Sequence, residues 1–432
     1  MIKGESNENS LIWCSMSEIE NLLIKNKQEH ILKVLNLCNE NQKQVLEKQL
    51  ESIDFNQVNN LYEISKQLNS GATSEGQKNN IEPLKVVDKY NIDQKYAQEI
   101  VSVGEEVIRQ GKYAVVTMAG GQGTRLGHQG PKGTYLLNIE PTPEYLFEII
   151  AKNLIQVNQK YGIVLNWYMM TSSENNVQTE SFLEEHDYFG YPKENVKLFI
   201  QDNLPLLSEE GKLLVDQNFQ IKFASSGNGN IYKAMRDSGV LADMKQKGIE
   251  WVFIGAVDNA LLNMVDPMLV GLAITDNNSI ASKTIIKANP HEKVGVFCKK
   301  NKVPFVIEYT ELSNEMAEEV NEKGELVYGE SHIMCNLYSL EALEKISVQT
   351  LPYHSAHKKI EYLDEAGKLV KPEAPNAYKY EAFIFDGFNY FNNISILRGR
   401  REEDFAPIKN KEGVDSPETA KKLYNDFHNK NQ

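Results

Sequence analysis

A glycine-rich stretch with two cations is the part of this sequence best suited to chemistry. The run VVTMAGGQGTRLGHQGPKGTYLL, residues 115–137, holds six glycines together with Arg125 and Lys132. Glycine lets the backbone turn sharply and bring its N–H groups against a ligand, and successive amides can form an anion-binding nest. Arg125 would add a planar fork of donors, and Lys132 a compact charge, both suited to phosphate oxygens. The stretch therefore predicts a phosphate-binding loop.

Three other interpretations of these glycines fit the spacing less well. A dinucleotide-binding loop requires G-x-G-x-x-G, whereas Gly121, Gly123 and Gly127 are spaced G-x-G-x-x-x-G. A P-loop requires a lysine directly after glycine, whereas Lys132 follows Pro131. A simple surface turn would leave both cations unexplained. A nucleotidyltransferase loop, which must hold a nucleoside triphosphate, is the interpretation that accounts for glycines and cations together.

Two aspartates at the ends of apolar runs are candidate metal ligands. Asp258 ends the run WVFIGAVD, at the place where α/β sheets put functional groups. Mg²⁺ is usually held by one or two carboxylates together with substrate phosphates, so Asp258 suits this role. It could instead cap the helix that follows. Asp386, at the end of AFIFD, is a second candidate of the same type.

Alternating strand and helix patterns must position these residues. Apolar runs at 113–119, 163–170, 196–200 and 251–257 predict strands, and amphipathic stretches at 142–159, 173–186 and 230–248 predict helices. Such alternation predicts an α/β fold with a mixed, mostly parallel sheet flanked by helices and with ligands at the carboxyl ends of the strands. In the helix at 142–159 we expect Thr142 as N-cap and Pro143 as the first helical residue. The segment 294–312 predicts a hairpin that turns at 299–302.

Length and charge limit the classes of function. The chain has 432 residues, which exceeds a single compact core, and a formal net charge of −14. We expect an N-terminal helical region at 1–100, an α/β catalytic domain at 101–388 and a C-terminal segment at 389–432. The acidity argues against nucleic acid as a partner, and no apolar run approaches the roughly 20 residues of a membrane span. We therefore expect a cytoplasmic protein without a membrane partner.

The motif G-G-x-G-T-R-L-G followed by P-K resembles the signature of the UDP-sugar pyrophosphorylase family, of UDPGP type. The resemblance is closest to the UDP-N-acetylglucosamine pyrophosphorylases and extends from His30 to Leu423, through stretches such as SSGNGNIYKAM, KYEAFIFD and FAPIKN. It implies the Rossmann-like nucleotide-diphospho-sugar transferase fold. It also implies a Mg²⁺-dependent reaction of UTP with a hexose 1-phosphate, which yields UDP-sugar and pyrophosphate.

The resemblance assigns roles to single residues. It implies nucleotide binding by Met118, Ala119, Gly120, Gly121, Gly123, Thr124, Gln201 and Gly227, and catalysis at the phosphates by Arg125, Lys132, Lys379 and Lys409, the last two as part of a C-terminal lid. It implies sugar binding by Asn228, Glu308 and His332, and metal binding by Asp258 and Asp386. His332 stands where the family often has asparagine, so an imidazole replaces a carboxamide.

That departure leaves the sugar open. N-acetylglucosamine 1-phosphate is the first expectation, and glucose or galactose 1-phosphate the alternative. A non-catalytic sensor of UDP-sugars is an alternative of another class, although a pure binder would not need both phosphate and metal residues. The sequence leaves the oligomeric state open, a monomer included.

Overall fold

The described residues form two compact units. The computed structural model describes residues 16–69 and 80–430. Unit 1 takes its described residues from Met1–Gly76, Asn203–Ser226 and Tyr353–Glu381, and unit 2 from Gln77–Asp202, Gly227–Pro352 and Ala382–Gln432. This division differs from the expected boundaries at residues 100 and 388, because the N-terminal helices share their unit with two later segments. None of the described helices is long and apolar enough to cross a membrane.

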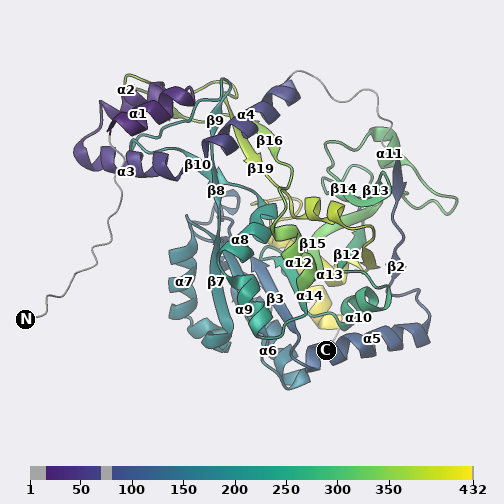
Figure 1. Ribbon diagram of the computed structural model, residues 1–432. Helices are drawn as coiled ribbons and strands as arrows, with labels where there is room; N and C mark the ends of the chain where they lie inside the picture. Colours follow the sequence, from purple (N-terminus) through teal and green to yellow (C-terminus); the bar gives the residue numbers. More distant parts are fainter. Residues whose placement is uncertain (1–15, 70–79, 431–432) are drawn as a thin grey trace, which may run out of the picture. The chain divides into compact units, whose positions relative to one another are not determined.

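Unit 2 is built on a mixed, mostly parallel sheet, as the strand–helix alternation predicts (Figure 1). Its main path runs β2-β20-β12-β15-β11-β3-β6-β7, with β1, β13 and β14 joined beside β15. Only β15 runs antiparallel to its neighbours on this path. The strands are β1 (Ile81–Pro83), β2 (Val87–Asp88), β3 (Tyr113–Met118), β6 (Asn166–Ser172), β7 (Val196–Gln201), β11 (Trp251–Ala256), β12 (Ile280–Ile286), β13 (Val296–Lys300), β14 (Val303–Ile307), β15 (Glu330–Ser339) and β20 (Ser395–Arg398).

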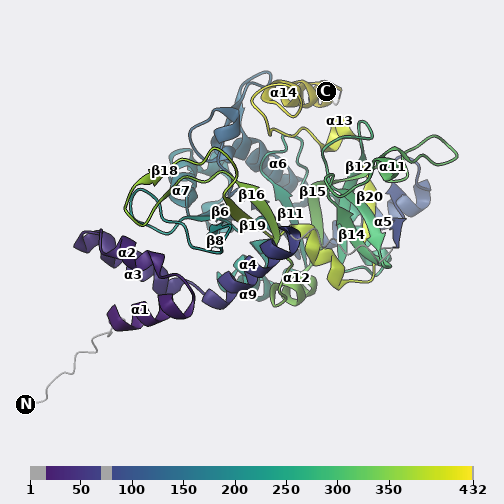
Figure 2. The same ribbon diagram turned by 90° about the horizontal axis from the view of Figure 1, so that it is seen from above.

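Helices cover both faces of this sheet. The longer ones are α5 (Gln94–Arg109), α6 (Leu146–Tyr161), α7 (Asn176–Glu185), α8 (Ile231–Asp237), α9 (Val240–Gln246), α10 (Pro267–Thr275), α12 (Leu340–Ser347) and α14 (Pro417–Lys430), and the short ones are α11 (Asn314–Glu318) and α13 (Arg401–Asp404). Figure 2 shows α6 and α14 on one side of the sheet and α9 and α12 on the other. Successive residues of β3 pack into two hydrophobic cores, one on each face of the sheet. Val115 belongs to the core that includes residues of α6, and Ala114 and Val116 belong to the core that includes residues of α9 and α12. Burial on both faces explains why the strand is continuously apolar.

Unit 1 is held together by the N-terminal helices and short strands. The helices are α1 (Met16–Lys25), α2 (His30–Leu35), α3 (Glu40–Ser52) and α4 (Phe55–Asn69). The strands are β8 (Asn203–Pro205), β9 (Leu207–Ser208), β10 (Phe223–Ser225), β16 (His354–Lys358), β17 (Tyr362–Leu363), β18 (Leu369–Val370) and β19 (Ala377–Glu381). Their shared core includes Leu46 and Leu50 from α3 together with Leu207, Leu213 and Tyr378.

Two local expectations have different outcomes. The hairpin is confirmed: β13 and β14 pair antiparallel, and Asn301 and Lys302 turn with positive φ angles of 54° and 70°. The predicted start of the helix at 142–159 is wrong, because α6 begins at Leu146 and not at Pro143. The residues before it are extended: β5 (Glu144–Tyr145) pairs with β4 (Leu136–Leu137). Strand pairing has overridden the capping signal.

Candidate phosphate-binding site

The glycine-rich loop follows β3 and folds back on itself. Its 3-10 helices are η1 (Thr124–Leu126) and η2 (Lys132–Thr134). The amide of Gly123 donates to the carbonyl of Gly130 at 2.9 Å, and the amide of Lys132 donates to the carbonyl of Gly121 at 3.0 Å. These two bonds close the loop, so that Lys132, eleven residues beyond Gly121, lies beside the start of the loop. Met118, Ala119, Gly120, Gly121, Gly123 and Thr124, all predicted to bind the nucleotide, belong to this stretch.

Gln201 is brought to the same loop from a strand that is distant in sequence. It ends β7 and is buried. A Cβ atom on Gly120 would lie only 2.6 Å from its Nε2 atom, so glycine is what permits this close approach. Gly120 and Gln201, which are both predicted to bind the nucleotide, are therefore neighbours at the carboxyl ends of β3 and β7.

Lys132 and Asp258 meet at the centre of the site. Lys132 Nζ lies 3.0 Å from Asp258 Oδ2, and both side chains are partly exposed. Asp258 follows β11, the parallel neighbour of β3, and the amide of Val257 donates to the carbonyl of Met118 at 3.1 Å. The two loops are thus held together by backbone as well as by side chains. The pair brings one cation and one carboxylate to the edge where the sequence predicts the ligand.

Lys409 is aligned with Asp258 by backbone pairing. The amide of Ile408 donates to the carbonyl of Asp258 at 2.8 Å, and Asn259 forms an antiparallel bridge with Pro407. Lys409 itself lies 3.6 Å from Asp415 and near the ring of Phe405. The same C-terminal stretch approaches the glycine loop: a Cβ atom on Gly127 would lie 3.9 Å from the side chain of Lys411. Arg125, on η1, has an exposed side chain on this loop.

The predicted sugar-binding residues form a second group around β15. The Nδ2 atom of Asn228, in η5 (Asn228–Asn230), lies 3.9 Å from the sulfur of Met334. A Cβ atom on Gly295 would lie 3.2 Å from Glu308 Oε1, and the carbonyl of Gly295 accepts the amide of His332. Gly227, which precedes η5, has a φ of 87°, a conformation that favours glycine. Asn228, Glu308 and His332 are thus gathered by the fold.

His332 is a buried, neutral imidazole. Its ring lies edge-on to Phe297, Phe385 and Phe388, and its Nε2 atom is 3.1 Å from Asn336 Oδ1. Burial lowers the pKa of His332 to about 4, and the bond to Asn336 opposes the shift only in part. At neutral pH the group therefore offers hydrogen bonding without charge. Its side chain packs among aromatic rings. The replacement of the asparagine common in the family by histidine did not indicate this environment.

Asp386 and Lys379 have other contacts. Asp386 is buried, and its Oδ2 atom accepts the amide of Phe383 at 3.0 Å, which caps the 3-10 helix η6 (Ile384–Tyr390). Lys379 belongs to β19 of unit 1 and lies 2.8 Å from Glu381. The metal role of Asp386 and the phosphate role of Lys379 stay predictions.

Three residues that hold the site together are not among the predicted site residues. Asn175 is fully buried and donates from Nδ2 to the carbonyl of Ala119 at 2.9 Å, which fixes the start of the glycine loop. His128 lies under Gly123 and its Nε2 atom is 2.8 Å from the hydroxyl of Thr134. Asn259 ties the loop after β11 to the C-terminal segment. Asn175 and Asn259 each follow a strand closely, and this position is a signal that could have identified them.

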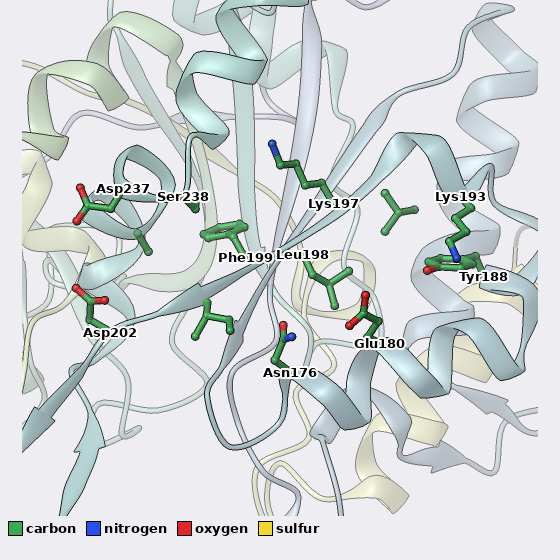
Figure 3. Close-up of a pocket in the computed structure, with 13 residues that line it drawn as sticks. Asn176, Glu180, Tyr188, Lys193, Lys197, Leu198, Phe199, Asp202, Asp237 and Ser238 are labelled. Atoms are coloured by element: carbon green, nitrogen blue, oxygen red, sulfur yellow. The ribbon is translucent and has the colours of Figure 1, made fainter. Parts of the chain in front are cut away.

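A separate groove does not belong to this site. A hollow of about 650 Å³ lies along β7, the last strand of the sheet, between α7 and the end of α8 (Figure 3). Its cations are engaged: Lys193 pairs with Glu184 at 2.7 Å and Lys197 lies 3.9 Å from Asp243. None of the predicted site residues lines the groove. It is therefore not the phosphate site.

Comparison with known proteins agrees with this geometry. A family model described as UTP–glucose-1-phosphate uridylyltransferase (UDPGP) matches residues 54–414. The UDP-N-acetylglucosamine pyrophosphorylase of Saccharomyces cerevisiae is 37% identical over 342 residues, which cover 76% of this chain and 72% of that protein. UDP-N-acetylglucosamine diphosphorylase 2 of Arabidopsis thaliana is 36% identical over 345 residues, 76% of this chain and 67% of that protein.

Solved structures give the same result. The uridine diphosphate N-acetylglucosamine pyrophosphorylase of Trypanosoma brucei, in complex with an inhibitor, matches with a TM-score of 0.79 and 28% identity, covering 95% of this chain and 85% of that one. The nucleotide-diphospho-sugar transferase fold expected from the sequence is thereby confirmed. The glycine loop, the Lys132–Asp258 pair and these matches agree with one another. The chain therefore belongs to the UTP–glucose-1-phosphate uridylyltransferase family.

Proposed function

We propose that this protein joins UTP to N-acetylglucosamine 1-phosphate, releasing pyrophosphate and forming UDP-N-acetylglucosamine. The observation that carries the proposal is the 3.0 Å contact between Lys132 and Asp258 at the carboxyl ends of β3 and β11. A cation for phosphate and a carboxylate for a metal are there held side by side, next to a loop of glycine amides. The choice of sugar rests on the names of the relatives from S. cerevisiae and A. thaliana.

The reaction asks the protein to position two polyanions and to neutralise charge. An oxygen of the sugar phosphate attacks the α-phosphorus of UTP, and a new P–O bond forms. The bond from that phosphorus to the oxygen bridging the α- and β-phosphates breaks, and pyrophosphate leaves with the electron pair. We assign Lys132 to the α-phosphate, and Arg125 and Lys409 to the departing phosphates. Fixed cations and amides that meet the developing charge supply most of the rate in such a reaction.

Asp258 fits a divalent cation, for which we propose Mg²⁺. Among the described residues no cluster of three or more His, Cys, Asp or Glu side chains could hold a metal on its own. A single partly exposed carboxylate is nevertheless what a Mg²⁺ ion shared with substrate phosphates requires. When bound, such an ion neutralises phosphate charge and orients the triphosphate. Asp386 is a weaker candidate for this role, because its carboxylate already caps η6.

The sugar would lie near β15. Glu308 can accept hydrogen bonds from sugar hydroxyls, and Asn228 offers both a donor and an acceptor. Asn228 Oδ1 already accepts the amide of Ile384 at 2.8 Å, which orients the carboxamide. Because His332 is neutral and packed among aromatic rings, we assign it a polar contact without charge. A sugar ring whose substituents other than the phosphate are uncharged is consistent with that environment.

A panel assay tests the proposal directly. The protein is mixed with UTP, Mg²⁺ and one of three sugar 1-phosphates, those of N-acetylglucosamine, glucose and galactose, and pyrophosphate release is followed. We expect the highest kcat/KM with N-acetylglucosamine 1-phosphate. A higher value with glucose or galactose 1-phosphate would overturn the choice of sugar. Binding of UTP by calorimetry without pyrophosphate release from any sugar would indicate the sensor class instead.

A further inference from the structure

A buried lysine lies between the two segments that carry Asp258 and Lys409. Lys283, in β12, is only 3% exposed. Its Nζ atom lies 2.8 Å from Asp266 and 2.9 Å from Asp404. Asp266 ends the loop that follows β11 and contains Asp258, and Asp404 begins the segment that leads to Lys409. One cation is therefore bound to both segments.

Lys283 and Asp266 hold each other in their charged forms. Burial alone would lower the pKa of Lys283, but the two aspartates outweigh it and the net shift is upward. Burial alone would raise the pKa of Asp266, but the charge of Lys283 outweighs it and the net shift is downward. Lys283 and Asp266 are therefore both charged near neutral pH. Apolar residues of similar volume often stabilise a protein as well as a buried ion pair does. Stability alone therefore does not explain the triad, and a role in fixing the relative position of the two segments is the alternative.

Asn259 links the same two segments directly. It is 4% exposed, and all of its side-chain polar atoms are engaged. Its Nδ2 atom donates to the carbonyl of Asp404 at 2.8 Å, while its Oδ1 atom accepts the amide of Ala406 at 2.8 Å and that of Leu261 at 3.1 Å. A residue next to Asp258 thus sets the backbone that runs into Lys409.

We propose that Asn259, supported by the Lys283–Asp266–Asp404 triad, is a positioning residue that fixes the separation of Asp258 and Lys409. The inference rests on the proposed function, in which these two groups act on the same triphosphate. Through its three hydrogen bonds Asn259 holds residues 404–408 against the loop after β11. The triad anchors the far ends of both segments. Errors of about 1 Å in such an arrangement can cost roughly a hundredfold in rate.

A double-mutant cycle tests this role. Asn259→Ala is expected to lower kcat at least about tenfold while the KM for the sugar phosphate stays within about threefold. If Asn259 acts through Lys409, its loss should matter little once Lys409 is gone. The variant Asn259→Ala/Lys409→Ala should then have nearly the kcat of Lys409→Ala alone, because residues that act as a unit are not additive.

Asn158→Ala is the matched control. Asn158 is also buried, and its Oδ1 atom accepts the amide of Leu165 at 3.1 Å, but it lies before β6, at the amino end of the strands. It should lower the melting temperature about as much as Asn259→Ala and leave kcat within about threefold. Its effect should also add to that of Lys409→Ala.

The outcomes separate the inference from the proposed function. No turnover by the wild-type protein with any sugar phosphate would overturn the proposed function. Turnover by the wild type together with a kcat for Asn259→Ala close to that of Asn158→Ala, or with full additivity in the cycle, would overturn the positioning role alone. If Asn259→Ala does not fold, Asp404→Asn is the second variant, with an expected loss of three- to tenfold in kcat and the same lack of additivity.

Discussion

Lys132 and Asp258 connect the loops after two adjacent strands, and each is expected to contribute more to rate than to stability. We predict that Lys132→Ala and Asp258→Asn each lower kcat at least ~100-fold, the scale of one lost electrostatic stabiliser. The physical reason is that Lys132 would stabilise the charge on the α-phosphate under attack, and Asp258 would hold the metal ion that neutralises the triphosphate. Steady-state pyrophosphate release measures the effect. Near-normal rates in both variants would contradict the assigned roles.

The same two strands offer a matched control for that prediction. Lys112 Nζ lies 2.8 Å from Glu250 Oε1, just before β3 and β11 begin, so this ion pair joins the strands at their opposite ends. It is more exposed than the Lys132–Asp258 pair, and exposed pairs contribute little to stability. Lys112→Ala should therefore keep kcat within about twofold. A loss like that of Lys132→Ala would mean that any break between these strands impairs the enzyme.

His332 gives a prediction on stability and pH. Its pKa is about 4 in the folded protein, against 6.5 for an ordinary histidine. Between these values the unfolded chain binds a proton that the folded chain does not, so stability falls as the pH decreases from 7 to 5. For this group the loss is about 2 kcal/mol. His332→Gln removes it, so the variant should lose about 2 kcal/mol less than the wild type between pH 7 and 5.

Urea unfolding at the two pH values measures the difference. All other titrating groups are shared by the two proteins, so their contributions cancel. An equal pH dependence in both proteins would show that the imidazole is not held in its uncharged form.

At the scale of elements, the glycine loop works through close packing. A Cβ atom on Gly133 would lie 2.2 Å from the ring of Phe147, whereas one on Gly121 would meet nothing within 4 Å. Gly133→Ala should therefore destabilise the protein by about 1–3 kcal/mol, the usual cost of overpacking. Because Gly133 follows Lys132 in η2, the variant should also lower kcat. Denaturant unfolding and the pyrophosphate assay provide the two measurements.

Gly121→Ala separates folding from ligand binding. With no atom to displace, it should change the free energy of unfolding by less than about 1 kcal/mol. Its new methyl group would stand on the loop surface assigned to UTP, so the Kd for UTP should rise. A large loss of stability in this variant would mean that other residues pack closely against the loop at Gly121.

The ends of the strands could be predicted from the sequence, but the extended segment that precedes α6 could not. Apolar runs that end in glycine or aspartate place Gly120 and Asp258 at one edge of a parallel sheet, because all such strands end there. Thr142 and Pro143 carry an equally clear capping signal, yet α6 begins at Leu146 because Glu144 and Tyr145 pair with β4. The capping signal depends on neighbouring residues, so it cannot show that a strand partner lies seven or more residues away.

The buried charges were also beyond the sequence. Nothing local in β12 indicates that Lys283 is paired, since its partners Asp266 and Asp404 lie in other elements, the second of them more than 100 residues away along the chain. Asn175 and Asn259 were missed for a related reason: each acts on backbone carbonyls or amides of another segment. Residue types and positions indicated Arg125, Lys132 and Asp258, and the resemblance to a family supplied most of the other predicted residues, but neither supplied the contacts that hold them.

At the scale of the whole molecule, the N-terminal helices are part of a shared core. Leu46, Leu50 and Leu61 are fully buried with Leu207 and Tyr378 from later segments. We predict that deleting residues 1–76 exposes this apolar surface, lowers the soluble yield and raises the fluorescence of the dye ANS above that of the full chain. A truncated protein with unchanged yield and dye binding would show that the later segments suffice for unit 1.

The composition of unit 1 has a consequence for how the protein is made. Helices α1–α4 are synthesised before the other elements of unit 1, but β19, which completes their core, ends at Glu381, more than 300 residues after Asn69. At roughly 5–20 residues per second, that interval lasts tens of seconds. During translation the apolar faces of these helices lack part of their core until the last third of this sequence has been made, so we expect a ribosome-associated chaperone to bind them in that interval.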